Sequence, residues 1–264
     1  MTKTDIIGHV RGDGTVKGLK AAYFRRIYIG LMLDLIIMIA SPLTVIITSA
    51  LLTRQMTEAG IKIMEISADT VLNYPSLLSR LLYALLVLRY CLAALSAMIV
   101  ISGMGELREC SPSFRRSCKY FVALMIMNAV VMVTRVAYIM VAHTETSMWA
   151  GTVNAVAEFS LIVTRGMALF LLLRGYEDVM NSIGAFTESQ KTHSLASFTV
   201  VSFAVYGMTR MLDHFAPPMT AEVSMTLFAA EALVMIIAMI IHIRVIKCSR
   251  NMYGIIAEIS DEAA

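Results

Sequence analysis

The apolar stretch from Val153 to Arg174 constrains the fold most, because it is long enough to cross a bilayer and still carries charged residues. Glu158 and Arg165 lie seven residues apart in it, which is about two turns of an α-helix, so both side chains occupy one helical face. Placing a charge in hydrocarbon costs at least about 2.5–3.5 kcal/mol. We therefore expect this face to point into a helix bundle, towards other polar groups.

Composition agrees with a membrane protein. Of 264 residues, 58% are hydrophobic and only 16% are charged, whereas a soluble domain is about half apolar and about a quarter charged. The net charge of +3 is small and the basic residues are spread along the chain, so nucleic-acid binding is not expected. We expect one all-α, polytopic domain over residues 1–264, with the lipid bilayer of a cell membrane as its surroundings.

Six apolar segments have the length of membrane-spanning helices, which need about 20 residues each. The expected spans are residues 27–53, 82–104, 120–142, 153–174, 195–214 and 224–246. The first is too long to be the apolar part of a signal peptide, so we expect it to remain as a helix. In the polar connection 54–81, apolar residues recur at helical spacing, which predicts a short amphipathic helix on the membrane surface.

The distribution of basic residues predicts the orientation. Fifteen Lys and Arg residues fall on one side of the bundle. They lie in the N-terminal segment 1–26, in the connections 105–119 and 174–194, and in the end of the chain from Arg244, which includes the tail 247–264. The other side has three. Because basic residues accumulate on the cytoplasmic side, both termini are expected in the cytoplasm.

Several charged residues fall inside these spans, and five of them lie at a similar depth below the outer surface. This layer consists of Arg89, Arg135, Glu158, Arg210 and Glu231. Arg165 is expected near the midplane, and Asp34 and His242 in the inner third. Arginine therefore outnumbers glutamate in the outer part of the bundle.

The charged layer has two interpretations. In the first, the charges form ion pairs that fasten the helices, and a surplus arginine reaches the lipid headgroups. In the second, the layer lines a cavity open to the outside, where arginine binds a small anion through its planar fork. Glu158 is expected to pair with Arg89 or Arg135. Arg135 and Arg165 are then the expected anion-binding residues, since Arg89 and Arg210 lie nearer glutamates or headgroups.

Other chemistry has little support in the sequence. Metalloprotease, serine hydrolase, P-loop and dinucleotide-binding motifs are absent, so we expect neither an enzyme nor a cofactor. Cys110, Cys118 and Cys248 match no common zinc-site spacing, and no metal is expected. Asp34 and His242 are compatible with a proton relay, although an Asp that is simply bonded to a neighbouring helix is the favoured interpretation.

Two functions follow as expectations. The first is a transporter or channel-like protein for a small anionic solute, with an interior lined by Arg and Glu. The alternative is a non-transporting membrane subunit, sensor or scaffold whose ion pairs are purely structural, with a protein partner docking on segments 105–119 and 175–194. A polar cavity favours the first function, and a closed, fully paired interior favours the second.

Overall fold

The computed structural model describes residues 20–58, 60, 77–105, 107–141, 147–215 and 221–262. The described part forms helices and turns with no strand, which confirms the all-α fold class. Its helices are α2 (Ala21–Glu58), α4 (Leu77–Met104), α5 (Pro112–Val141), α6 (Ser147–Ser182), α7 (Phe186–Phe215) and α8 (Ala221–Glu262). The start of the basic N-terminal segment and most of the expected surface helix in 54–81 lie outside the described residues.

Within the described residues, five helices are long and apolar enough to cross a membrane, judged by length and composition. These segments are Ala84–Met104, Pro112–Tyr138, Trp149–Ser182, Phe186–Leu212 and Ala229–Glu258. Large apolar side chains such as Leu88, Val133 and Ile240 are exposed on the outside of the bundle, as expected for a lipid-facing surface. The structure is therefore compatible with a multi-pass membrane protein, while the count of six spans and the orientation of the termini stay predictions.

Two connections expected to be polar loops are largely helical. Helix α5 begins at Pro112, where Ser111 Oγ accepts a hydrogen bond from the backbone N–H of Ser113 at 3.0 Å, a helix cap followed by proline at the first helical position. Helices α6 and α7 are joined by a tight turn in which Gly184 has a φ of 75° and the N–H of Ala185 donates to Met180 O at 2.8 Å. Segments 105–119 and 175–194 are thus mainly helix ends.

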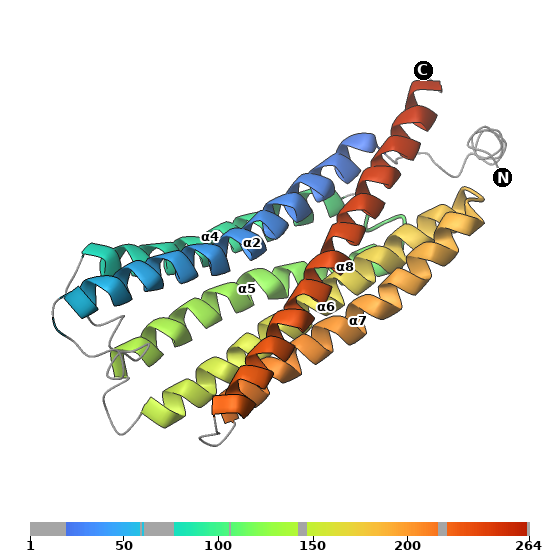
Figure 1. Ribbon diagram of the computed structural model, residues 1–264. Helices are drawn as coiled ribbons and strands as arrows, with labels where there is room; N and C mark the ends of the chain where they lie inside the picture. Colours follow the sequence, from blue (N-terminus) through green and yellow to red (C-terminus); the bar gives the residue numbers. More distant parts are fainter. Residues whose placement is uncertain are drawn as a thin grey trace.

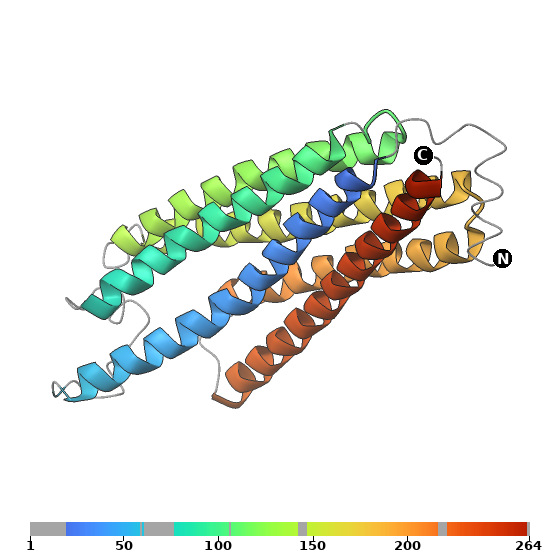
Figure 2. The ribbon, with the colours of Figure 1, turned by 90° about the horizontal axis from the view of Figure 1, so that it is seen from above.

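The helices form a closed ring (Figures 1 and 2). Each helix packs against its neighbours in the order of the chain, and α8 packs against α2 to complete the circle. Helix α8 is inclined to the others and passes from the end of α7 towards the start of α2. A ring of six helices leaves an interior that side chains from every helix can reach.

Along its length the bundle has two halves, and the half that contains the start of α2 and the end of α8 is close-packed. At its centre the buried ring of Tyr176 lies 6.0 Å from that of Phe24 and 5.8 Å from that of Phe114, measured between ring centroids. Tyr176 also donates a hydrogen bond to Ser249 Oγ at 2.8 Å, which links α6 to α8. This half supplies most of the large, fully buried side chains.

Glycine allows α2 and α4 to approach closely there. A Cβ atom added at Gly103 would lie 2.7 Å from the carbonyl oxygen of Tyr23, a backbone atom that cannot rotate away. At Gly254, which lies within α8, an added Cβ would meet nothing within 4 Å. Small residues at such contacts let membrane helices pack backbone against backbone.

We therefore expect Gly103→Ala to destabilise the bundle by about 1–3 kcal/mol, the usual range for overpacking. The measurement is the apparent Tm of the purified protein in detergent. Gly254→Ala is the matched control and should be neutral or slightly stabilising, since alanine favours a helix by up to about 1 kcal/mol over glycine. Equal Tm values for the two variants would contradict the close α2–α4 contact.

Candidate functional site

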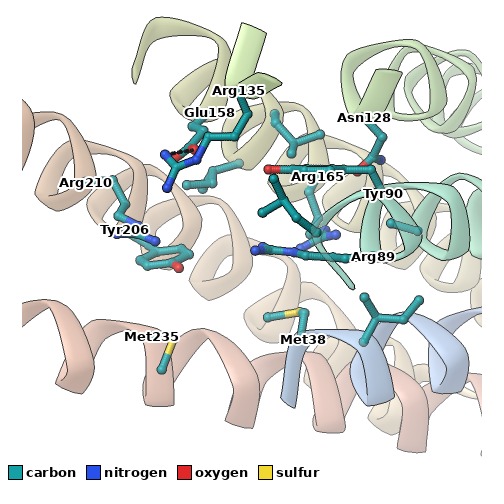
Figure 3. Close-up of a pocket in the computed structure, with 15 residues that line it drawn as sticks. Met38, Arg89, Tyr90, Asn128, Arg135, Glu158, Arg165, Tyr206, Arg210 and Met235 are labelled. Carbon is teal, nitrogen blue, oxygen red and sulfur yellow. Dashed lines mark hydrogen bonds and ion pairs between the residues drawn. The ribbon is translucent and has the colours of Figure 1, made fainter. Parts of the chain in front are cut away.

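A cavity of about 150 Å³ lies inside the ring, and all six helices contribute to its wall (Figure 3). The charged residues that line it are Arg89, Arg135, Glu158, Arg165 and Arg210. Other polar residues of the wall are Tyr90, Asn128 and Tyr206, and the apolar ones are Ile37, Met38, Leu86, Ala93, Leu161, Ile162 and Met235. The cavity occupies the half of the bundle beyond the close-packed aromatic core.

The first ion pair of this region joins α5 to α6. Arg135 Nη1 donates to Glu158 Oε1 at 3.2 Å, and Asn154 Nδ2 donates to the same oxygen at 3.2 Å. Thr134 Oγ1 adds a long contact of 3.4 Å to the amide oxygen of Asn154. The carboxylate of Glu158 is thus held by donors from two helices, and the sequence-based pairing of Glu158 with an arginine is realised with Arg135.

The second ion pair joins α7 to α8. Arg210 Nη1 lies 2.9 Å from Glu231 Oε1, and Tyr206 lies beside Arg210 in the cavity wall (Figure 3). Glu231 is not itself part of the lining. Its carboxylate therefore neutralises Arg210 from the α8 side.

The third ion pair forms the floor of the cavity. Arg165 Nη2 donates to Asp34 Oδ1 at 3.0 Å, which links α6 to α2 across the ring. His242 of α8 is fully buried, its Nε2 donates to Leu31 O at 3.1 Å, and the same nitrogen lies 3.8 Å from Asp34 Oδ2. Three helices therefore meet at one buried carboxylate, which is the neighbour-bonded Asp that the sequence favoured.

Two buried nitrogens of the floor have no hydrogen-bond partner among the described residues, namely Arg165 Nε and His242 Nδ1. Buried polar atoms of this kind are rare, because each lost hydrogen bond costs about 1–3 kcal/mol. The floor is therefore a place where a further polar group or a water molecule would be stabilising.

Arg89 differs from the other three arginines of the cavity. No carboxylate lies within ion-pair distance of it in the described part of the chain, and its recorded contact is with the ring of Tyr90, 5.5 Å from the centroid. The cavity and its immediate surroundings thus hold four arginines against the carboxylates of Asp34, Glu158 and Glu231. With histidine neutral, one positive charge is left over.

The structure brings together all six residues that the sequence singled out: five line the cavity and Glu231 pairs behind it. The choice of anion-binding residues changes, however. The sequence favoured Arg135 and Arg165, but both have carboxylate partners here, which makes Arg89 the stronger candidate. Asp34 was not among the expected site residues, although its position as a lone charge in an apolar run marked it as buried.

In the described residues, no group of three or more His, Cys, Asp or Glu side chains is placed so that it could hold a metal ion. Cys110 is exposed in the connection between α4 and α5, while Cys118 is buried within α5. Partial burial and the adjacent Glu109 carboxylate raise the pKa of the Cys110 thiol, so that thiol is less reactive than an ordinary cysteine at neutral pH.

Comparison of the chain with protein-family models, curated proteins and solved structures finds no match in any of the three. Any functional conclusion about this chain therefore rests on the site itself.

The floor ion pair gives the first prediction about this region. Asp34→Asn should destabilise the protein by about 3–5 kcal/mol, because Arg165 then keeps a buried charge without a partner. The apparent Tm in detergent is the measurement, and the double variant Asp34→Asn with Arg165→Gln should recover part of the loss.

Glu58→Gln provides the control for that experiment. It removes an exposed ion pair with Arg54, whose atoms lie 2.9 Å apart, and should change stability by less than about 1 kcal/mol. If Asp34→Asn is as mild as this control, the floor pair does not hold the ring together.

Proposed function

We propose that this chain is a multi-pass membrane protein that binds and moves a small anionic solute through the cavity inside its helix ring. The observation that carries the proposal is the cavity lined by four arginines, one of which has no carboxylate partner among the described residues. A bound carboxylate or phosphate would stabilise such an arginine and would be oriented by it. Ionisable groups inside a membrane bundle commonly mark a solute pathway.

Access to the cavity supports the same proposal. Side-chain exposure falls from 40% at Arg210 and 36% at Arg135 to 15% at Arg165 and 0% at His242. The charges thus form a path that begins at the end of the bundle where α2 ends and stops at the buried floor. Because the connections at that end contain few basic residues, we place it on the outer side of the membrane.

A structural role remains the second candidate, and one observation favours it. All three carboxylates of the region bridge different helices, so most of the charge is already paired. On this alternative the chain is a subunit or scaffold, and a partner docks at the helix ends in segments 105–119 and 175–194.

A thermal-shift screen of purified protein against small anions separates the two candidates. A ligand that binds only the native state raises the apparent stability, by about 2.7 kcal/mol at a concentration 100 times its Kd. The shift should disappear in Arg89→Gln and persist in Arg54→Gln, a variant that removes a surface arginine of similar chemistry. Stabilisation by cations alone, or by no solute in the panel, would favour the structural role.

Topology is tested with single-cysteine variants in intact and permeabilised cells, using a membrane-impermeant thiol reagent. With the other cysteines replaced, Cys110 should react only after permeabilisation, and an added cysteine at Gly60 should react in intact cells. Labelling of Cys110 is best done at alkaline pH, because its raised pKa keeps the thiol protonated at neutral pH and the reactive thiolate appears only as the pH rises. The opposite pattern at both positions would reverse the proposed orientation.

A further inference from the structure

Charged and apolar residues share the wall of the cavity, and α4 and α6 contribute both kinds, with Leu86, Ala93, Leu161 and Ile162 as their apolar residues. The charged residues come from α4, α5, α6 and α7, whereas α2 and α8 contribute only Ile37, Met38 and Met235. Figure 3 shows Met38 and Met235 on the α2 and α8 ribbons, across the cavity from Arg135 and Glu158. A solute that fills such a space contacts charged groups over part of its surface and apolar side chains over the rest.

The charge balance limits the ligand to one negative charge. Arg89 supplies the single surplus positive charge, because Arg135, Arg165 and Arg210 each have a carboxylate partner. A dianion would bring a second charge into the bundle, where it stays uncompensated unless one of these carboxylates is displaced, and a buried uncompensated charge is strongly unfavourable. The planar guanidinium of Arg89 matches the two oxygens of a carboxylate.

The size of the space limits the apolar body. A dry cavity of about 150 Å³ is large enough to bind benzene, and this cavity has a volume of about 150 Å³. Seven of its fifteen lining residues are apolar, so a purely polar ion such as chloride or phosphate would leave that apolar surface facing water. A carboxylate with a short hydrocarbon chain or a small ring fits both the volume and the lining.

Resting on the proposed function, we propose that the cavity is a binding site for a short-chain monocarboxylate, with the carboxylate on Arg89 and the hydrocarbon body against the α2 and α8 side of the wall. The substrate class follows from the amphiphilic lining together with the single unpaired arginine. A free short-chain acid and a long-chain fatty acid from the bilayer share this chemistry, and a volume of about 150 Å³ matches the short-chain acid.

The test measures binding of acetate, butyrate, benzoate, decanoate, succinate, phosphate and chloride to the purified full chain by titration calorimetry. Affinity should rise about fourfold for each methylene from acetate to butyrate, as expected for burial of each group, and should fall again at decanoate. Succinate, phosphate and chloride should bind more weakly than butyrate. A lipid-derived ligand would instead give affinity that keeps rising to decanoate, which would overturn the short-chain assignment.

Variants locate the site. Arg89→Gln should lower butyrate affinity by about 10- to 100-fold, as for a lost charge-assisted hydrogen bond, while Arg89→Lys retains part of it. Met235→Gln should lower butyrate affinity several-fold and leave acetate nearly unchanged. Arg54→Gln is the control and should bind like the unaltered chain. Binding of butyrate that is indifferent to both Arg89 variants would overturn the site.

Failure of this inference is distinguishable from failure of the proposed function. If phosphate or chloride binds best and depends on Arg89, the anion site stands and the monocarboxylate class is wrong. If no anion binds to the folded, unaltered chain, both fall and the structural role is favoured. The ligand series alone decides between these outcomes should the Arg89 variants fail to fold.

Discussion

The carboxylates of Asp34, Glu158 and Glu231 each lie against an arginine of a different helix, and the architecture around the cavity depends on that pairing. Charges in an apolar bundle are costly unless they are paired and hydrogen-bonded, so the helices have to adopt rotations that bring Arg135 to Glu158, Arg210 to Glu231 and Arg165 to Asp34. These pairs connect α5 to α6, α7 to α8, and α6 to α2. These ion pairs determine which face of each helix points inward. Apolar residues determine it less strictly, because an apolar side chain is stable both against lipid and in the protein core.

Different interactions hold the helices together in the two halves of the bundle. Near the start of α2, close backbone contact at Gly103 and the aromatic contacts of Tyr176 exclude space, while beyond Arg165 the arginine side chains hold the helices around a cavity. Dispersion contacts favour full closure of a helix interface, but closure here would bury the guanidinium of Arg89, which has no carboxylate partner among the described residues. The cavity therefore arises where surplus positive charge meets apolar helices.

The sequence predicted the all-α class and the inward position of Glu158 and Arg165, because a long apolar run with two charges on one face has few other solutions. It could not identify the partner of Arg165, since Asp34 is distant in the chain and the pairing depends on how α2 is rotated in the ring. For the same reason Arg89 was expected near a glutamate. The helical continuation through segment 175–194 was also missed, because Tyr176, Val179 and Met180 continue a buried helical face through a stretch whose overall composition is polar.

On the proposed function, the position of the floor determines how a solute would cross the bundle. Helices α2 and α8 close the ring, and His242 of α8 contacts Leu31 O and lies near Asp34 of α2, directly below the cavity. A solute leaving towards the close-packed half has to pass this cluster, so the Arg165–Asp34 pair must separate or move as a unit. A carboxylate held near Arg165 offers that arginine an alternative partner and lowers the cost of separation. The residues that stabilise the closed ring are thus the ones whose rearrangement a bound anion would favour. A conformational change driven by a ligand requires such a difference in its interaction with the two states.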